Sequence, residues 1–245
     1  IDAAIFMHPT TWKASGHVEG FSDPLVECKK CKRRFRADHV ANMCPECGGD
    51  FGEVRQFNMM FQTQIGATEG SVSYLRPETA GGIFVNFKNI IDSFHPKLPF
   101  GIGQIGKAFR NEIAPRDFIF RVREMEQMEI EYFVRPTEWE ESFEMWRESV
   151  HAFNESVGIP RTAVHELEVA DGDRAHYSKR TIDFEFDFPF GRKELYGLAY
   201  RTDFDLSAHE KGSSTELRYL DDTTGEKFVP HVIEPSFGVD RTVLA

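Results

Sequence analysis

The chain is 245 residues long, carries a formal net charge of −11, and contains 40% hydrophobic and 28% charged residues. This length allows one sizeable hydrophobic core and a small appendage, and the composition is ordinary for a globular protein. The sequence shows no apolar run long enough to span a membrane and no signal-peptide pattern. The acidic balance argues against nonspecific wrapping around nucleic acid, because phosphate contacts need basic patches, but it does not exclude a local contact with RNA.

The N-terminal part contains turn signals followed by all the cysteines of the chain. We expect residues 1–27 to form an irregular lead-in. Two Cys-x-x-Cys pairs follow, with twelve residues between them: Cys28, Cys31, Cys44 and Cys47. Four thiolates at this spacing are typical of a structural Zn²⁺ site. Two disulfides are the alternative, but nothing in the sequence indicates an oxidising compartment, and a redox role needs one pair and not two. The sequence predicts a zinc ribbon inserted at residues 26–50, held by the metal because it is too small for its own core.

The middle of the chain predicts a strand, a helix and two long strands. We expect a strand over Arg55–Gln64. Apolar residues at helical spacing predict an amphipathic helix after Thr79 that Pro96 stops. Two long strands are expected between Phe100 and Phe133, joined by a loop at 113–117.

The C-terminal half adds a second helix and further strands. Thr137 and Glu140 read as a capping box before a helix that ends at Gly158. Apolar and acidic residues alternate over Ile182–Phe188, which is typical of a strand with one wet face. More strands are expected near 194–199 and 228–234. Strands outnumber helices and connect by hairpins, so the predicted fold class is α+β, an antiparallel β-sheet flanked by helices.

Two arginines near opposite ends of the chain suggest a site for an anion. Arg110 lies in Phe-Arg-Asn-Glu, and Arg241 closes Glu-Pro-Ser-Phe-Gly-Val-Asp-Arg. A charged side chain among apolar residues and carboxylates is costly unless it meets an anion, and an arginine fork fits a phosphate bidentately. The two segments therefore predict a clamp on a polyphosphate.

Period-two alternation predicts a polar face on the second of the two long strands. It puts on one face Arg121, Arg123, Met125, Gln127 and Glu129. By the same parity, Arg110 and Glu112 share a face of the preceding strand. A rigid, sheet-borne polar face suits a binding site. A solvated face crossed by ion pairs is the alternative, and these residues alone leave both open.

Several motifs carry a resemblance to a known family. Phe109–Glu112, followed after a short loop by Arg121 and Met125, resembles motif 2 of the class II aminoacyl-tRNA synthetases, and Gly238–Arg241 resembles the end of their motif 3. Further segments resemble the glycyl-tRNA synthetases of the homodimeric type, in the same order along the chain: Ala14–Val18, Phe35–His39, Phe57–Phe61, Leu75–Ala80, Glu126–Tyr132, Arg201–Leu206 and Val232–Ser236. The resemblance covers nearly the whole chain.

The resemblance implies a class II catalytic domain over residues 1–245. Such an enzyme activates glycine with ATP to glycyl-adenylate and pyrophosphate, then transfers glycine to the acceptor end of tRNA(Gly). It implies a homodimer in the cytoplasm with no membrane association. The chain begins with Ile1 and stops at Ala245 in an apolar segment, so we expect both ends to be cut from something longer. The resemblance does not extend to the family's anticodon-binding domain, which we expect this chain to lack, so adenylate formation is a firmer expectation than tRNA charging.

The resemblance also implies roles for individual residues in binding ATP. Arg110 would bind the α-phosphate and Arg241 the γ-phosphate, as the two catalytic residues. The other implied ATP-binding residues are Asn111, Glu112, Phe120, Arg121, Met125, Glu194, Leu195 and Gly238. Glu194 would act through Mg²⁺. Met125 stands where the family usually stacks a phenylalanine on adenine, so we expect weaker nucleotide binding.

Glycine has no side chain to contact, so a glycine-specific site must bind the ammonium group and exclude amino acids with larger side chains. The resemblance implies an anionic pocket of Glu78, Glu129 and Glu234. It also implies substrate contacts from four further residues, namely Gln127, Ser236, Arg201 and Arg36.

Two other functions compete with a glycine ligase. One is a non-catalytic relative serving as an accessory or regulatory protein, and such relatives lose the phosphate-binding arginines and the acidic pocket. The other is a class II ligase for serine, proline or threonine. ATP–pyrophosphate exchange with each amino acid separates the three possibilities.

Overall fold

The computed structural model describes residues 1–67 and 70–245. These residues form two compact units. The first unit contains residues 1–4, 78–107 and 125–245, and the second contains residues 5–77 and 108–124. Within the described part of the chain, no helix has both the length and the apolarity needed to cross a bilayer.

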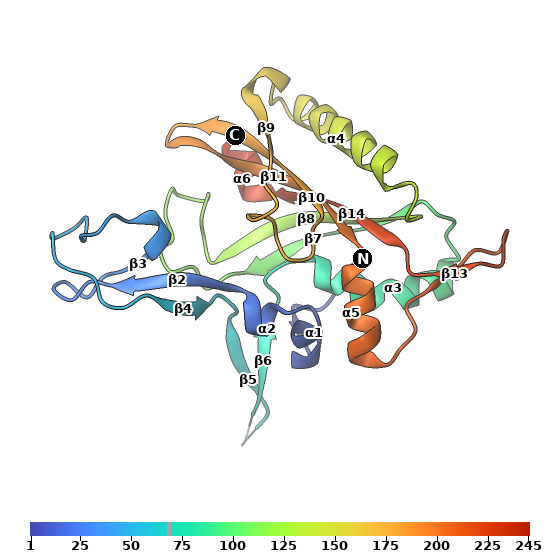
Figure 1. The fold of residues 1–245 in the computed structure, drawn as a ribbon, viewed down its shortest axis with the longest axis horizontal. Coiled ribbons are helices and arrows are strands. Elements are labelled where there is room, and N and C mark those ends of the chain that lie inside the picture. The colour runs from blue at the N-terminus through green and yellow to red at the C-terminus, as the bar shows by residue number, and fades with distance from the viewer. Residues whose placement is uncertain (68–69) are drawn as a thin grey trace. The chain divides into compact units, whose positions relative to one another are not determined.

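The first unit is built on a sheet of six strands (Figure 1). Their spatial order is β7 (Phe100–Phe109), β8 (Glu124–Val134), β14 (His231–Gly238), β11 (Gly191–Thr202), β10 (Arg180–Phe188) and β9 (Val164–Glu168). The pairs β8–β14, β14–β11, β11–β10 and β10–β9 are antiparallel. The predicted antiparallel sheet flanked by helices is therefore confirmed.

Helices cover both faces of this sheet (Figure 1). On one face, α3 (Ala80–Phe94) and α5 (Phe204–Ser213) form a hydrophobic core with Phe133 of β8 and Val232 of β14. On the other face lies α4 (Trp139–Ser156), where Trp146 meets Tyr132 of β8. Tyr132 and Phe133 are neighbours on one strand, so they point to opposite faces, as the two-residue period of a strand requires. The short helix α6 (Val239–Leu244) follows β14, and a small hairpin joins β12 (Tyr219–Leu220) to β13 (Lys227–Phe228).

The second unit contains two small sheets. The first sheet has the order β1 (Phe6–Met7), β6 (Ser71–Leu75) and β5 (Gln62–Ile65), and the second has the order β3 (Arg34–Arg36), β2 (Ser22–Glu27) and β4 (Arg55–Asn58). Two short helices, α1 (Pro9–Ala14) and α2 (His17–Gly20), precede β2. Trp12 of α1 is fully buried against Met60 and Tyr74, which gives this unit its own small core.

Several sequence-based expectations about the elements need correction. Residues 1–27 are not an irregular lead-in, because they form two strands and two helices. The single strand expected over 55–64 is two strands in different sheets, β4 and β5. The helix after Thr79 is confirmed as α3, and Gly158, with a φ of 94°, follows α4 as predicted. The capping box is wrong, because α4 begins after Glu138 without a side-chain cap.

The period-two alternation predicted for the two long strands holds for only some of the residues assigned to it. Arg110 and Glu112 lie beyond the end of β7 at Phe109, and Arg121 and Arg123 lie before the start of β8. These four residues belong to an irregular loop, where a period of two does not apply. Within β8 the parity is confirmed, since Gln127 and Glu129 are both buried on one face.

Candidate functional site

The face of the six-stranded sheet covered by α3 and α5 carries a cluster of buried carboxyl groups. Glu129 and Glu131 of β8 are 3% and 0% exposed, and Glu234 of β14 is 5% exposed. The register pairs Glu129 with Ser236 and Tyr132 with Ile233, which puts Glu131 opposite Glu234. Acidic side chains are almost never this buried without partners, so the cluster marks a special environment.

Glu129 is held by four hydrogen bonds. Its Oε2 accepts from the N–H groups of Thr79 and Ala80, both at 2.8 Å, and from the Thr79 hydroxyl. Its Oε1 accepts from the Ser236 hydroxyl at 2.8 Å. Thr79 gives α3 no side-chain cap of its own, so the carboxylate from β8 satisfies the first donors of that helix.

Arg201 is the one guanidinium in the cluster, within the described residues. It is 1% exposed and sits in a bulge of β11, between Tyr200 and Thr202. Its Nε and Nη2 donate to the two oxygens of Asp205 on α5, at 2.7 and 2.8 Å, and its Nη1 donates to Glu234 at 2.6 Å. The ring of Tyr177 lies 3.7 Å from its Cζ. This geometry fixes the guanidinium rigidly beside the carboxyl groups.

The cluster has more carboxyl groups than positive charges to balance them. Burial raises the pKa of Glu234, the charge of Arg201 opposes this, and the charges of Glu129 and Glu78 add to it. Burial raises the pKa of Glu131 well above its usual range, and the charge of Glu234 adds to this. Like charges in a dry site cannot all be ionised together, so this cluster favours a bound cation.

The middle of the same sheet face is left open by a glycine. The register places Gly197 of β11 between Asp183 of β10 and Ser236 of β14. A Cβ at Gly197 would meet nothing within 4 Å. Burial, together with the charge of Glu194, raises the pKa of Asp183 to about 7. Next to the carboxyl cluster, the sheet thus presents a bare backbone surface on which a flat group can lie.

Arg241 and Glu194 meet beside this open surface. Arg241 is in α6, and its Nη1 lies 3.0 Å from the backbone oxygen and 3.1 Å from the Oε2 of Glu194. Gly238 precedes α6, and a Cβ there would meet the Arg241 side chain at 3.4 Å. Leu195 is buried at 1% exposure. The structure brings these four sequence-predicted residues together.

The second unit gathers five further predicted ATP-binding residues in the loop between β7 and β8. The Nε of Arg110 donates to the backbone oxygen of Pro77 at 3.0 Å, and its guanidinium lies 5.5 Å from the centre of the Phe21 ring. Glu112, which is buried, accepts from Arg121 at 3.3 Å. Two more residues complete the group: the N–H of Asn111 donates to Met59, and Phe120 is 7% exposed.

Arg36 on β3 lies in the same unit and is already paired. It contacts Asp23 at 2.7 Å and Asp38 at 2.8 Å. The hydrogen bonds that Arg36 donates to the Asp38 carboxylate are the main reason that the pKa of Arg36 is raised. Arg36 is thus held in place by carboxylates of its own unit.

The four cysteines converge as their spacing predicts. Their sulfur atoms all lie within 4.8 Å of one another, with Cys28 3.6 Å from Cys47 and Cys31 3.7 Å from Cys44. Zn–S bonds of about 2.3 Å in a tetrahedron separate the sulfurs by about 3.8 Å. The N–H of Cys31 also donates to the Cys28 sulfur at 3.4 Å, as in a metal-binding knuckle. The donor set and its size therefore fit a tetrahedral zinc ion.

The predicted site residues divide between the two units. Glu78, Met125, Gln127, Glu129, Glu194, Leu195, Arg201, Glu234, Ser236, Gly238 and Arg241 lie in the first unit, and Arg36, Arg110, Asn111, Glu112, Phe120 and Arg121 lie in the second. The predicted clamp of Arg110 and Arg241 on one polyphosphate joins residues of both units and stays a prediction. Sequence reasoning missed Glu131, Asp205 and Tyr177. The period-two alternation of Gln127 and Glu129 continues to Glu131 and could have found it.

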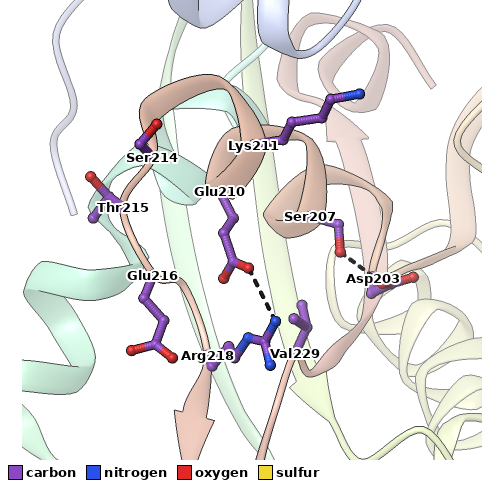
Figure 2. A pocket seen from close by; sticks show the side chains of 9 residues that line it. All are labelled: Asp203, Ser207, Glu210, Lys211, Ser214, Thr215, Glu216, Arg218 and Val229. Atoms are coloured by element: carbon purple, nitrogen blue, oxygen red, sulfur yellow. Dashed lines mark hydrogen bonds and ion pairs between the residues drawn. The ribbon is translucent and has the colours of Figure 1, made fainter.

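A separate pocket of about 750 Å³ lies around the C-terminal end of α5 (Figure 2). Two pairs of its polar side chains are hydrogen-bonded: Ser207 donates to Asp203 at 2.7 Å, and Arg218 donates to Glu210 at 3.5 Å. Glu210 also accepts from the N–H of Leu217 at 2.9 Å. These contacts fix the loop after α5, and the pocket contains none of the predicted site residues.

Comparisons with known proteins agree with this architecture. Residues 61–245 match the family model of the tRNA synthetase class II core domain (G, H, P, S and T). The glycine–tRNA ligase of Treponema denticola is 51% identical over 253 residues, which cover 100% of this chain and 56% of that protein. Those of Alkaliphilus oremlandii and Bacillus anthracis are 49% and 48% identical over 277 residues, covering 100% of this chain and 60% of each protein. The chain thus spans a little over half the length of these curated relatives.

A solved structure shares the fold at much lower sequence similarity. The Giardia lamblia prolyl-tRNA synthetase in complex with prolyl-adenylate superposes with a TM-score of 0.61 at 16% identity, over 76% of this chain and 35% of that one. At this identity the likeness speaks for the fold alone. The family match covers most of the chain, and the antiparallel sheet with its flanking helices is the architecture that the match requires. The chain belongs to the class II aminoacyl-tRNA synthetase core family.

Proposed function

We propose that this chain is the catalytic core of a glycine–tRNA ligase. It activates glycine with ATP to glycyl-adenylate and pyrophosphate, and the complete protein transfers glycine to the acceptor end of tRNA(Gly). The similarity to glycine–tRNA ligases over the whole chain supports this choice within the family.

The observation that carries the proposal is the carboxyl cluster around a single guanidinium. Glu129, Glu234 and Glu78 are all buried, and Arg201 is the positive charge among them. An ammonium group is the cation that an amino acid brings, and a dry anionic pocket binds it strongly. Glycine offers no side chain to contact, so reading its ammonium in a tightly packed site is the available source of specificity. Gln127 and Ser236 complete the hydrogen bonds of this pocket.

The nucleotide is proposed to use the arginines of both units. Arg110 binds the α-phosphate, where its charge stabilises the transition state of adenylate formation, and Arg241 binds the γ-phosphate. Glu112, Phe120 and Arg121 seat the adenosine with Asn111, and Met125 packs on the base. Glu194, with its neighbours Leu195 and Gly238, lies beside Arg241. Mg²⁺ is a hard cation that favours oxygen ligands, so the Glu194 carboxylate together with phosphate oxygens would hold it and neutralise phosphate charge.

We further propose that the four cysteines hold a structural zinc ion. The sulfur spacing supports a tetrahedral thiolate site. Its role is to fix the ribbon that carries Arg36. Arg36 lies on β3, the strand that follows the turn with Cys28 and Cys31, so the metal would hold this strand in place. Arg36 is proposed to contact substrate from there.

The remaining parts of the proposal follow from the family alone. The complete protein is proposed to act as a homodimer in the cytoplasm, where tRNA is charged. No residue of this chain is assigned to the dimer contact.

ATP–pyrophosphate exchange tests the proposal without requiring tRNA. Exchange should depend on glycine and be absent with serine, proline or threonine. Arg110→Ala should lower glycine-dependent exchange by about two orders of magnitude or more, as expected for a lost transition-state contact, and Arg161→Ala on the surface should not change it. Exchange with another amino acid would reassign the substrate, and none with any amino acid would favour a non-catalytic accessory protein.

A further inference from the structure

Glu131 is the carboxyl group of the cluster to which no described residue donates a hydrogen bond. Its side chain is 0% exposed, and neither Oε1 nor Oε2 has a hydrogen-bond partner among the residues that the structure describes. Glu129, two residues earlier on the same face of β8, accepts four hydrogen bonds. A carboxylate without donors is not stable in a dry site, whereas a neutral carboxylic acid is tolerated. Glu131 is therefore the carboxyl group best suited to keep its proton.

The groups around Glu131 reinforce this state. Glu234 lies opposite it on β14, Glu129 lies two residues away on β8, and the negative charge of Asp205 on α5 also acts on it. Arg201 of β11 is the nearby cation, but it already donates to Asp205 and to Glu234.

Two further titratable groups interact electrostatically with Glu234. These are Glu78, which precedes α3, and Tyr177, in the loop before β10. Like charges directly opposite each other on neighbouring strands repel, so Glu131 and Glu234 cannot both be ionised at neutral pH. Glu234 receives the Arg201 hydrogen bond and Glu131 receives none, so the shared proton resides on Glu131. Burial and the charge of Glu234 raise the pKa of Glu131 in agreement with this geometry.

We propose that Glu131 holds one proton while the amino-acid site is empty and releases it when the ammonium group of the substrate enters. The inference rests on the proposed function, because it requires an amino acid whose ammonium binds among these carboxyl groups. The exchange is balanced: the O–H bond of Glu131 breaks, the proton passes to the solvent, and the amino acid keeps all three of its N–H protons. One positive charge enters the cluster and one leaves it. Glu131 is thus a positioning residue that adjusts the charge of the pocket.

This coupling would make amino-acid affinity depend on pH. While Glu131 is protonated in the free protein, each unit of pH should tighten binding about tenfold, because one proton is released per molecule bound. The dependence should be measured near neutral pH, where the charge of free glycine itself does not change. A role of Glu131 in packing alone would produce no such dependence.

Titration calorimetry with glycine tests the inference, carried out at one pH in phosphate and in Tris. The two buffers differ in their heat of protonation, so a released proton makes the observed enthalpy differ between them. We expect release of about one proton per glycine for the unchanged chain. Glu131→Gln keeps the shape of the neutral acid without a proton to lose, so its enthalpy should be the same in both buffers and its affinity should not vary with pH. Glu141→Gln, an exposed change on α4, is the matched control and should release the proton normally.

Each outcome decides between the two proposals. Glycine binding with equal enthalpies in both buffers overturns the inference and leaves the proposed function standing. Undiminished proton release by Glu131→Gln also overturns it, because the proton then belongs to another group such as Glu234. Absence of both glycine binding and glycine-dependent exchange in the unchanged chain overturns the proposed function itself. If Glu131→Gln does not fold, equal enthalpies in the two buffers for the unchanged chain would still overturn the inference.

Discussion

Glu129 and Thr79 lie fifty residues apart in the sequence and are joined by two hydrogen bonds, one to the backbone N–H at 2.8 Å and one to the hydroxyl. The same carboxylate oxygen accepts from the N–H of Ala80. A helix N-terminus attracts negative charge because its first N–H groups have no partner within the helix. Glu129 is thus both the cap of α3 and a wall of the candidate amino-acid pocket.

Replacing Glu129 tests this double role. Glu129→Ala should lower the free energy of unfolding by about 2 kcal/mol, because α3 loses its cap and buried donors lose their acceptor. Urea unfolding measures this, and Glu141→Ala on the surface of α4 should change it by less than about 0.5 kcal/mol. Glycine-dependent exchange should fall more than ATP binding does. Exchange that survives at the normal rate would show that Glu129 is a structural cap only.

Arg201 is expected to be the most sensitive charged residue of the first unit. Arg201→Met leaves Asp205 and Glu234 buried without their counter-ion, which should cost about 3–5 kcal/mol of unfolding free energy. Arg161→Met removes an exposed pair with Glu148, for which we expect at most about 1 kcal/mol. Urea unfolding of the two variants gives the comparison. Equal losses of unfolding free energy in the two variants would mean that the buried ion pairs of Arg201 stabilise the fold no more than an exposed pair does.

Gly197 tests whether the open sheet surface accepts the nucleotide. Valine suits a strand, and a Cβ at this position meets no protein atom within 4 Å, so Gly197→Val should fold with an unchanged melting temperature. The added side chain would stand on the surface where a flat group is expected to lie. ATP binding measured by calorimetry should weaken at least about tenfold, equivalent to about 1.4 kcal/mol. Normal ATP affinity in the folded variant would show that the nucleotide binds elsewhere.

The cysteine cluster predicts one zinc ion per chain. Metal analysis of the purified protein should find this stoichiometry, and Cys44→Ser should abolish it by removing one of four ligands. Because the site lies in the second unit, limited proteolysis should then cut near residues 28–51 before the core of the first unit. Full zinc content in the variant, or an intact Cys28–Cys31 disulfide in the unchanged chain, would contradict the assignment.

Local patterns in the sequence were enough to predict part of this protein. The helical spacing of α3, the alternation along β10 and the Cys-x-x-Cys pairs each depend on neighbours within a few residues. The helix and the strand are confirmed, and the four cysteine sulfurs come together as the spacing predicts. The motif residues predicted to bind substrates were likewise recognisable because they occur in short, ordered segments. Their roles stay predictions.

Contacts between distant segments decided the rest. Thr137 and Glu140 have the local pattern of a capping box, yet α4 begins without it, while α3 is capped by Glu129 from a strand far along the chain. No short window of sequence contains that contact. The environment of Glu131 is also non-local, because β14, β11 and α5 each bring a charged group to it. Whether a glutamate is a solvated anion or a buried acid depends on its desolvation and on its partners, and only the folded chain determines both.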